Sequence, residues 1–458
     1  MMERVFCPVC RREVEADKVA LNEAIDDSVK PLLAVNAFGW EPGREICWDC
    51  LSRFYRVRSE LNKAFPDFAK QELKILPTPL RLDASSDWRG RGVTIAFIDA
   101  GFYAHPDLTE PRKRILKYVN IVAPTNPEDL YTPHVSAWHG MMTSTVAAGN
   151  GFMSNGLYRG IASEANLVLL KVGESSRIRH EDIERGLRWC IANREKYNIR
   201  IINISCGGDY EESYLTDALS QAAEDATRAG ILVVAAAGNS GHLQYHPILP
   251  PASAPSVLTV GGLDDRNNLD FEDNTMYRSS FGPTIDGLQK PEVIAPGIWI
   301  AAPILPGTPT AEQATLFSQL EHASDDELVP IIQRHPRVDA DLDEAVNLAP
   351  YLIRNMVWIK VRDHNVISGH YKHVDGTSFA APIVSSIAAQ ILEAAPHLKP
   401  HQVKSLLIKT AVRLPHIPID QQGWGMLNSR AAIAMALTHK ESIVEHQSRM
   451  KDVASGDE

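Results

Sequence analysis

The sequence lacks an uninterrupted stretch of about 20 apolar residues, the length that a transmembrane helix requires. Its first residues, MMERVFCPVCRREVEADK, also lack the apolar core of a secretory signal. Basic residues are not in excess, because 57 aspartates and glutamates outnumber 46 lysines and arginines. These absences argue against a membrane protein, an exported protein and a general nucleic-acid binder, so we expect a cytoplasmic protein with neither membrane nor nucleic acid as a partner.

Cysteines are few, and four of the six form two CxxC pairs near the N-terminus, Cys7 with Cys10 and Cys47 with Cys50. Two such pairs can supply four thiolates to one tetrahedral structural zinc. Unrelated reduced thiols and a redox pair are the alternatives, but neither explains the symmetry of the two pairs. We therefore predict a zinc-ribbon-like module over residues 1–60, with a structural or protein-contacting role.

The rest of the chain alternates apolar runs with amphipathic segments. The runs are VTIAFIDAG (93–101), NLVLLKVG (166–173), IRIINISCGG (199–208), GILVVAAAGN (230–239) and VLTVGGLD (257–264). Runs of this kind are typical of strands covered on both faces, and the segments between them have helical periodicity. The alternation predicts an α/β fold with a doubly wound, mostly parallel sheet, in which ligands bind beyond the carboxyl ends of the strands.

The predicted domain boundaries lie where this alternation of apolar runs and amphipathic segments begins, is interrupted or ends. We expect a linker over residues 61–84, the sheet domain over 85–438 and a polar tail over 439–458. Residues 304–368 interrupt this alternation with a segment typical of two or three helices, and we therefore predict an insertion there. It carries the acidic runs SDDE and DADLDE beside apolar faces that need something to pack on. A lid or docking surface that limits access of substrates is one interpretation, and surface decoration or an oligomer contact is the other.

Ser378 precedes a long run of alanines and aliphatic residues with helical spacing. A serine at a helix N-terminus can simply cap the helix, but this position also favours a developing negative charge. A nucleophilic serine needs a base and an acid elsewhere. His139 opens a second helix of small residues, and Asp99 ends a buried strand, where a carboxylate is costly unless it is paired. Asn239 ends another strand and could donate to an oxyanion.

Eight short blocks then identify a family. They are AFIDAGFYAHPDL, HGMMTSTVAAGNG, INISCGG, VVAAAGNSG, LPPASAPSVLTVGG, SSFGP, KPEVIAPG and GTSFAAP, in this order. Over about residues 85–438 the chain resembles the subtilisin-like serine proteases, whose order of Asp, His and Ser matches Asp99, His139 and Ser378. The resemblance implies a serine endopeptidase that works through an acyl-enzyme. Ser378 would be the nucleophile, His139 the general base and then acid, Asp99 its orienting partner and Asn239 the oxyanion donor.

The resemblance also implies how a substrate is held. Ser205, Cys206 and Gly207 would pair with an extended peptide strand, and Ala237 and Gly238 would form the wall of the specificity pocket. Substrates would be proteins or peptides. The alternative is a catalytically silent peptide-binding or regulatory protein of the same fold.

Two further features of the sequence are a departure from the family pattern and a candidate ligand for a second metal ion. Met141 and Met142 stand where the family usually has a threonine and a second histidine. Asp107 matches a position that ligates calcium in many relatives, so the resemblance allows calcium as a cofactor besides zinc. Protein partners could bind through the N-terminal module or the insertion.

Overall fold

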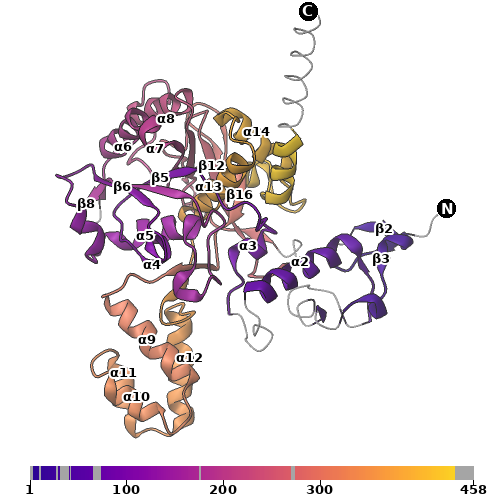
Figure 1. Ribbon diagram of the computed structural model, residues 1–458, viewed down its shortest axis with the longest axis vertical. Helices are drawn as coiled ribbons and strands as arrows, with labels where there is room; N and C mark the ends of the chain where they lie inside the picture. Colours follow the sequence, from indigo (N-terminus) through magenta and orange to yellow (C-terminus); the bar gives the residue numbers. More distant parts are fainter. Residues whose placement is uncertain are drawn as a thin grey trace, which may run out of the picture.

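The computed structural model describes residues 4–9, 12–26, 29–30, 33, 41, 43–64, 74–174, 177–269 and 274–438 (Figure 1). Its centre is an eight-stranded sheet with the order β13-β12-β11-β10-β5-β7-β6, in which β16 also pairs with β12. The strands are β5 (Thr94–Asp99), β6 (Ile115–Asn120), β7 (Asn166–Lys171), β10 (Ile199–Ile204), β11 (Leu232–Ala236), β12 (Leu258–Asp264), β13 (Thr275–Met276) and β16 (Val293–Pro296). All neighbours run parallel except β12 and β13. The five predicted strands are β5, β7, β10, β11 and β12, and the predicted α/β class with a mostly parallel sheet is confirmed.

Helices cover both faces of this sheet (Figure 1). Ile95 and Phe97 of β5 share one hydrophobic core with Ile383, whereas Ala96 and Ile98 share the other with Leu187. This division follows from the alternation of side chains along a strand. The first core includes helices α5 (Ala137–Ala148), α13 (Thr377–Ala394) and α14 (Pro400–Thr410), and the second includes α6 (His180–Ala192) and α8 (Ala218–Arg228). Shorter helices are α3 (Thr78–Arg81), α4 (Pro106–Thr109), α7 (Arg194–Tyr197) and α15 (Ile419–Gln422).

Helix α13 is the most apolar part of the first core. By length and composition alone it could cross a membrane, but 89% of its 18-residue window is buried inside the protein. Small residues such as Ala380, Ala381 and Ala388 let it pass close beneath the strands, and all three are fully buried. It is therefore a core helix, and its N-terminus lies at the carboxyl edge of the sheet.

The insertion lies between two paired strands. β17 (Ile300–Pro303) and β18 (Tyr371–Val374) are antiparallel neighbours. Between them come α9 (Pro309–His322), α10 (Leu328–Arg334), α11 (Ala340–Glu344) and α12 (Pro350–Asp363), which project from the sheet domain as a group (Figure 1). They bury a core of their own, which includes Phe317, Leu328 and Ile353.

The described part of the N-terminal module packs on the sheet domain through α2 (Trp48–Ala64). The Arg53 guanidinium, which is buried, donates to the carbonyl oxygens of Leu269 at 2.7 Å and Arg81 at 3.1 Å. Arg81 in turn donates through Nη2 to Asp265 Oδ1 at 2.5 Å, and Leu269 lies in the same hydrophobic core as Phe54. The remaining short strands are β1 (Arg4–Phe6), β2 (Glu13–Glu15), β3 (Val19–Ala20), β4 (Ile46–Cys47), β8 (Gly173–Glu174), β9 (Arg177–Ile178), β14 (Gly282–Pro283) and β15 (Gln289–Lys290).

Candidate active site

Asp99 and His139 form a buried hydrogen-bonded pair at the carboxyl end of β5. Asp99 Oδ1 lies 2.7 Å from His139 Nδ1, and the Ala100 N–H donates to the same oxygen at 2.7 Å. Asp99 Oδ2 accepts a hydrogen bond from the Thr143 hydroxyl at 3.1 Å. Both carboxylate oxygens thus have hydrogen-bond partners, and these offset the free-energy cost of burying the charge. Sequence reasoning missed Thr143, although its position one helical turn after His139 indicates that it faces the same way.

Electrostatics at this pair favour the charged imidazole. Burial lowers the pKa of His139, but the negative charge of Asp99 and the hydrogen bond to it outweigh that effect, so the pKa is raised from its ordinary value. Because Nδ1 is engaged by Asp99, Nε2 is the ring nitrogen left for proton transfer. Gly140 permits the close approach of the two elements, since a Cβ there would lie 2.1 Å from the carbonyl oxygen of Gly101.

Ser378 lies in the first turn of α13, beside the end of β10. Its hydroxyl donates to the backbone oxygen of Ser205 at 3.0 Å, and the Ser205 hydroxyl donates to the backbone oxygen of Ser378 at 2.8 Å. In this structure the Ser378 hydroxyl therefore points to Ser205 and not to His139. The imidazole is nevertheless close to the start of α13, because its ring centre lies 5.9 Å from that of Phe379. Rotation of the Ser378 side chain is the movement that a hydrogen bond to Nε2 requires.

Asn239 follows β11 and is held by the turn that leads into α13. Its Oδ1 accepts hydrogen bonds from the Thr377 N–H at 3.0 Å and the Thr377 hydroxyl at 2.9 Å. The same hydroxyl accepts from the Gly238 N–H at 3.2 Å. With its oxygen occupied in this way, Asn239 has its NH₂ group free to donate toward the start of α13. Gly376 adopts φ +140°, a conformation that L side chains rarely adopt, so glycine suits this turn.

The five residues expected to bind substrate lie at the ends of β10 and β11. Ser205 contacts Ser378 as described, and the Cys206 thiol contacts the backbone oxygen of Ile98 at 3.7 Å. Burial, and secondarily the charge of Asp99, raise the pKa of Cys206 well above its ordinary value, so the thiol stays protonated and unreactive. Gly207 follows Cys206, while Ala237 pairs through its N–H with Val260 and leads into Gly238.

Asp107, the residue that the resemblance links to calcium, is fully buried and has protein partners on both oxygens. Oδ1 accepts from the Met153 N–H at 2.9 Å, and Oδ2 accepts from the Tyr371 hydroxyl at 2.5 Å. Tyr371 begins β18, immediately after the insertion. A calcium ion bound by Asp107 would share these oxygens with the two donors, because each carboxylate oxygen has two lone pairs.

Three of the four cysteines expected to bind zinc come together. The Sγ atoms of Cys7, Cys47 and Cys50 lie within 4.8 Å of one another, and the first two side chains are buried. A tetrahedral zinc with bonds of about 2.3 Å holds its thiolates about 3.8 Å apart, which is compatible with this upper limit. Cys10 lies outside the described residues.

Comparison with known proteins assigns this α/β fold with its mostly parallel sheet to a family. A family model described as the subtilase family matches residues 90–425, which is more than half of the chain, and the chain therefore belongs to that family. Serine protease AprX from Bacillus subtilis (strain 168) is 34% identical over 326 residues, which cover 69% of this chain and 61% of that protein. Subtilisin E from the same organism is 30% identical over 255 residues, covering 55% of this chain and 58% of that protein.

A solved structure of a protease from Pseudoalteromonas arctica PAMC 21717 has the same fold. Its TM-score is 0.52 at 20% identity, and the match covers 79% of this chain and 94% of that chain. The chain spans less than two thirds of the length of the curated relatives named above. Family model and relatives together therefore show membership of the subtilase family.

Proposed function

We propose that this protein is a serine endopeptidase that cleaves peptide bonds in proteins or peptides by means of Asp99, His139 and Ser378. The observation that carries the proposal is the 2.7 Å contact between His139 Nδ1 and Asp99 Oδ1, next to a serine at the start of a buried helix. We also propose a cytoplasmic location, since the thiols of the N-terminal module stay reduced in that compartment.

The mechanism begins when the Ser378 hydroxyl turns from Ser205 toward His139. Ser378 Oγ attacks the substrate carbonyl carbon while His139 Nε2 takes its proton, and Asp99 stabilises the imidazolium that forms. The new oxyanion accepts hydrogen bonds from the Asn239 amide and the Ser378 N–H. His139 then gives the proton to the leaving amine, and an acyl-enzyme remains on Ser378. Water attacks the ester and passes a proton to His139, which returns it to Ser378 as the acid product leaves.

Substrate would lie along the end of β10 in an extended conformation. Ser205, Cys206 and Gly207 would offer backbone groups to pair with it, as an added strand does at a sheet edge. Ala237 and Gly238 would border the pocket for the residue before the cleaved bond. The small methyl group of Ala237 and the absence of a side chain at Gly238 would leave room there.

The test compares wild type with Ser378→Ala, using Ser405→Ala on α14 as a matched control. A peptide library read by mass spectrometry should show cleavage by wild type and the control and almost none by Ser378→Ala. A sulfonyl fluoride probe should label the same two proteins. Equal cleavage by Ser378→Ala would refute the assignment, and a folded wild type that neither cleaves nor reacts would favour the silent peptide-binding alternative.

We further propose that Cys7, Cys10, Cys47 and Cys50 bind one structural zinc. Four thiolates leave no open position, so the ion would crosslink the module and take no part in hydrolysis. Protein prepared without chelators should contain about one zinc per chain. Exchange of Cys47 and Cys50 for serine should release it, whereas Cys190→Ala, in the sheet domain, should retain it. Absence of zinc from the wild-type protein would refute this site.

A further inference from the structure

Trp138 is an exposed aromatic residue whose place the packing of the protein does not explain. It lies in the first turn of α5, where Ala137 and Met141 are buried but 44% of Trp138 is exposed. Among the described residues it belongs to none of the hydrophobic cores, and its indole N–H has no hydrogen-bond partner there. A single exposed apolar residue is ordinary on a protein surface, so its meaning depends on what lies beside it.

The indole lies against the imidazole of His139. The two ring centres are 5.2 Å apart and the ring planes are 87° apart, which is an edge-to-face contact. The His139 side chain is still 22% exposed. During hydrolysis its Nε2 must reach both Ser378 Oγ and the leaving amine, so a substrate bound for cleavage lies next to this ring. The open surface of Trp138 is therefore within reach of a residue close to the cleaved bond.

The order of the strands indicates which substrate residue this is. β10 lies between β11 and β5. The substrate is proposed to run along the end of β10, with the residue before the cleaved bond directed toward Ala237 and Gly238, which follow β11. Successive side chains of an extended chain point to opposite sides. The second residue before the cleaved bond therefore points toward the end of β5, where Asp99 holds His139. Trp138 lies on that side.

We propose that Trp138 determines specificity by selecting a large apolar side chain, such as leucine or phenylalanine, at the second residue before the cleaved bond. Contact with the indole removes apolar surface of both groups from water, whereas a small polar side chain leaves the indole hydrated. Asp99 is 1% exposed, so it offers no open oxygen that would favour a lysine instead. The inference rests on the proposed peptidase function and adds one determinant of its substrate preference.

The test uses two synthetic fluorogenic peptides that differ only in leucine or serine at the second residue before the cleaved bond. Wild type should cut the leucine peptide with a kcat/KM about tenfold higher, at the low end of the range for apolar pockets, because this site is open to solvent. Trp138→Ala should bring the two kcat/KM values close together, and Trp138→Phe should retain most of the difference. A ratio measured within one enzyme is independent of any effect that the substitution has on proton transfer by His139.

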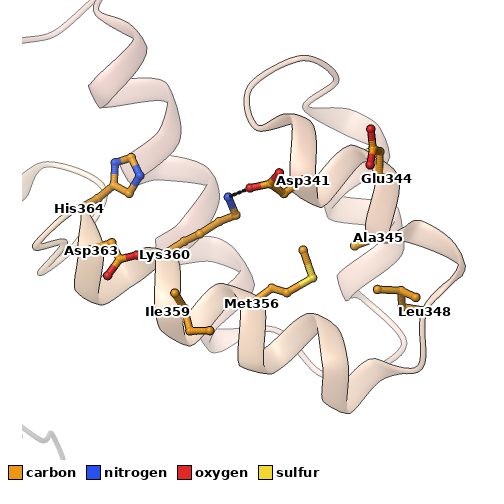
Figure 2. Close-up of a pocket in the computed structure, with 9 residues that line it drawn as sticks. All are labelled: Asp341, Glu344, Ala345, Leu348, Met356, Ile359, Lys360, Asp363 and His364. Carbon is orange, nitrogen blue, oxygen red and sulfur yellow. Dashed lines mark hydrogen bonds and ion pairs between the residues drawn. The ribbon is translucent and has the colours of Figure 1, made fainter.

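Trp358→Ala is the matched control. It removes an indole that is 59% exposed on α12. The neighbouring Ile359 and Lys360 line a groove of about 530 Å³ within the insertion, where Lys360 pairs with Asp341 of α11 at 2.7 Å (Figure 2). The control indole therefore belongs to a surface of the insertion and not to the ring contact of His139. Its variant should keep the wild-type ratio of the two kcat/KM values.

Trp138→Glu tests the same position by changing the preference instead of removing it. A third peptide carries lysine at the second residue before the cleaved bond. The glutamate would attract this lysine and would no longer offer an apolar surface to leucine. The kcat/KM ratio of the lysine peptide to the leucine peptide should therefore rise about tenfold over its wild-type value, and salt should reduce the gain. Circular dichroism shows whether each variant folds, and if Trp138→Ala does not, Trp138→Glu and Trp138→Phe carry the test.

Several results would overturn the proposal. Equal kcat/KM values for the leucine and serine peptides in wild type, or an unchanged ratio in Trp138→Ala, would contradict it directly. A peptide library read by mass spectrometry locates the position affected, and a change confined to residues after the cleaved bond would also contradict it. Peptide binding to the full chain carrying Ser378→Ala separates the two proposals. If wild type cuts neither peptide, but Ser378→Ala binds the leucine peptide more tightly and added Trp138→Ala removes that difference, the role of Trp138 stands and the proposed function fails.

Discussion

Replacement of Tyr371 by phenylalanine removes one hydroxyl from the contact between β18, which follows the insertion, and Asp107 of α4. That hydroxyl donates to Asp107 Oδ2 at 2.5 Å, and the two residues are 1% and 0% exposed. The ring can stay in place, because its centre packs 5.3 Å from that of Tyr158. A hydrogen bond to a charged group contributes about 1.5–3 kcal/mol, and here a buried carboxylate oxygen is left without its donor. We expect a loss near the upper end, about 2–3 kcal/mol of unfolding free energy.

Urea unfolding at neutral pH measures this loss, and Tyr158→Phe is the matched control. Tyr158 shares the ring contact but is not a partner of Asp107, so its variant should lose much less stability. Burial, and then the charge of Asp107, raise the pKa of Tyr371 above its ordinary value. A raised pKa stabilises the fold below the unfolded value of about 10 and loses that effect above it, so the gap between wild type and Tyr371→Phe should narrow at higher pH. Equal losses in the two variants would refute the reasoning.

Three further predictions concern catalysis. Because the pKa of His139 is raised, kcat/KM should fall with acid from a midpoint above pH 6.5, and a midpoint below that value would contradict the electrostatic argument. Asn239→Ala should lower kcat by about 10²–10³-fold with little change in KM, as steady-state kinetics on a short peptide would measure, and an unchanged kcat would remove it from the oxyanion site. A short Gly/Ser linker in place of residues 304–368 should leave cleavage of short peptides intact and widen the range of protein substrates; an unchanged range in a protein library would refute selection by the insertion.

The sequence predicted those parts of the structure that depend on local pattern. Apolar runs identified the central strands, and Asp99 and His139 could be paired because one ends a strand and the other begins a helix. Contacts between distant segments were not predictable in this way. Tyr371 and Asp107 are 264 positions apart, and no periodicity relates them. The Ser378 side chain is a similar case, since it donates to the backbone oxygen of Ser205, just after β10.

Arg53 is a second residue whose contacts could not be predicted from the sequence. No pattern in the sequence indicates the role of Arg53, yet it is buried and donates to two backbone oxygens. A long side chain of this type can serve either role. Only the fold shows that Leu269 and Arg81 lie beneath it.

The contact between Arg53 and Leu269 has a consequence for the newly made chain. The two residues are separated by 216 positions, yet Leu269 belongs to the core that also contains Leu51 and Phe54. At a synthesis rate of roughly 5–20 residues per second, roughly 10–40 s pass between the emergence of one and of the other. During that interval Arg53 lacks one of its two carbonyl partners, and the core around Leu51 and Phe54 lacks Leu269. The end of the protein that is made first therefore completes its native packing late, and a ribosome that stops before Leu269 leaves it unfinished.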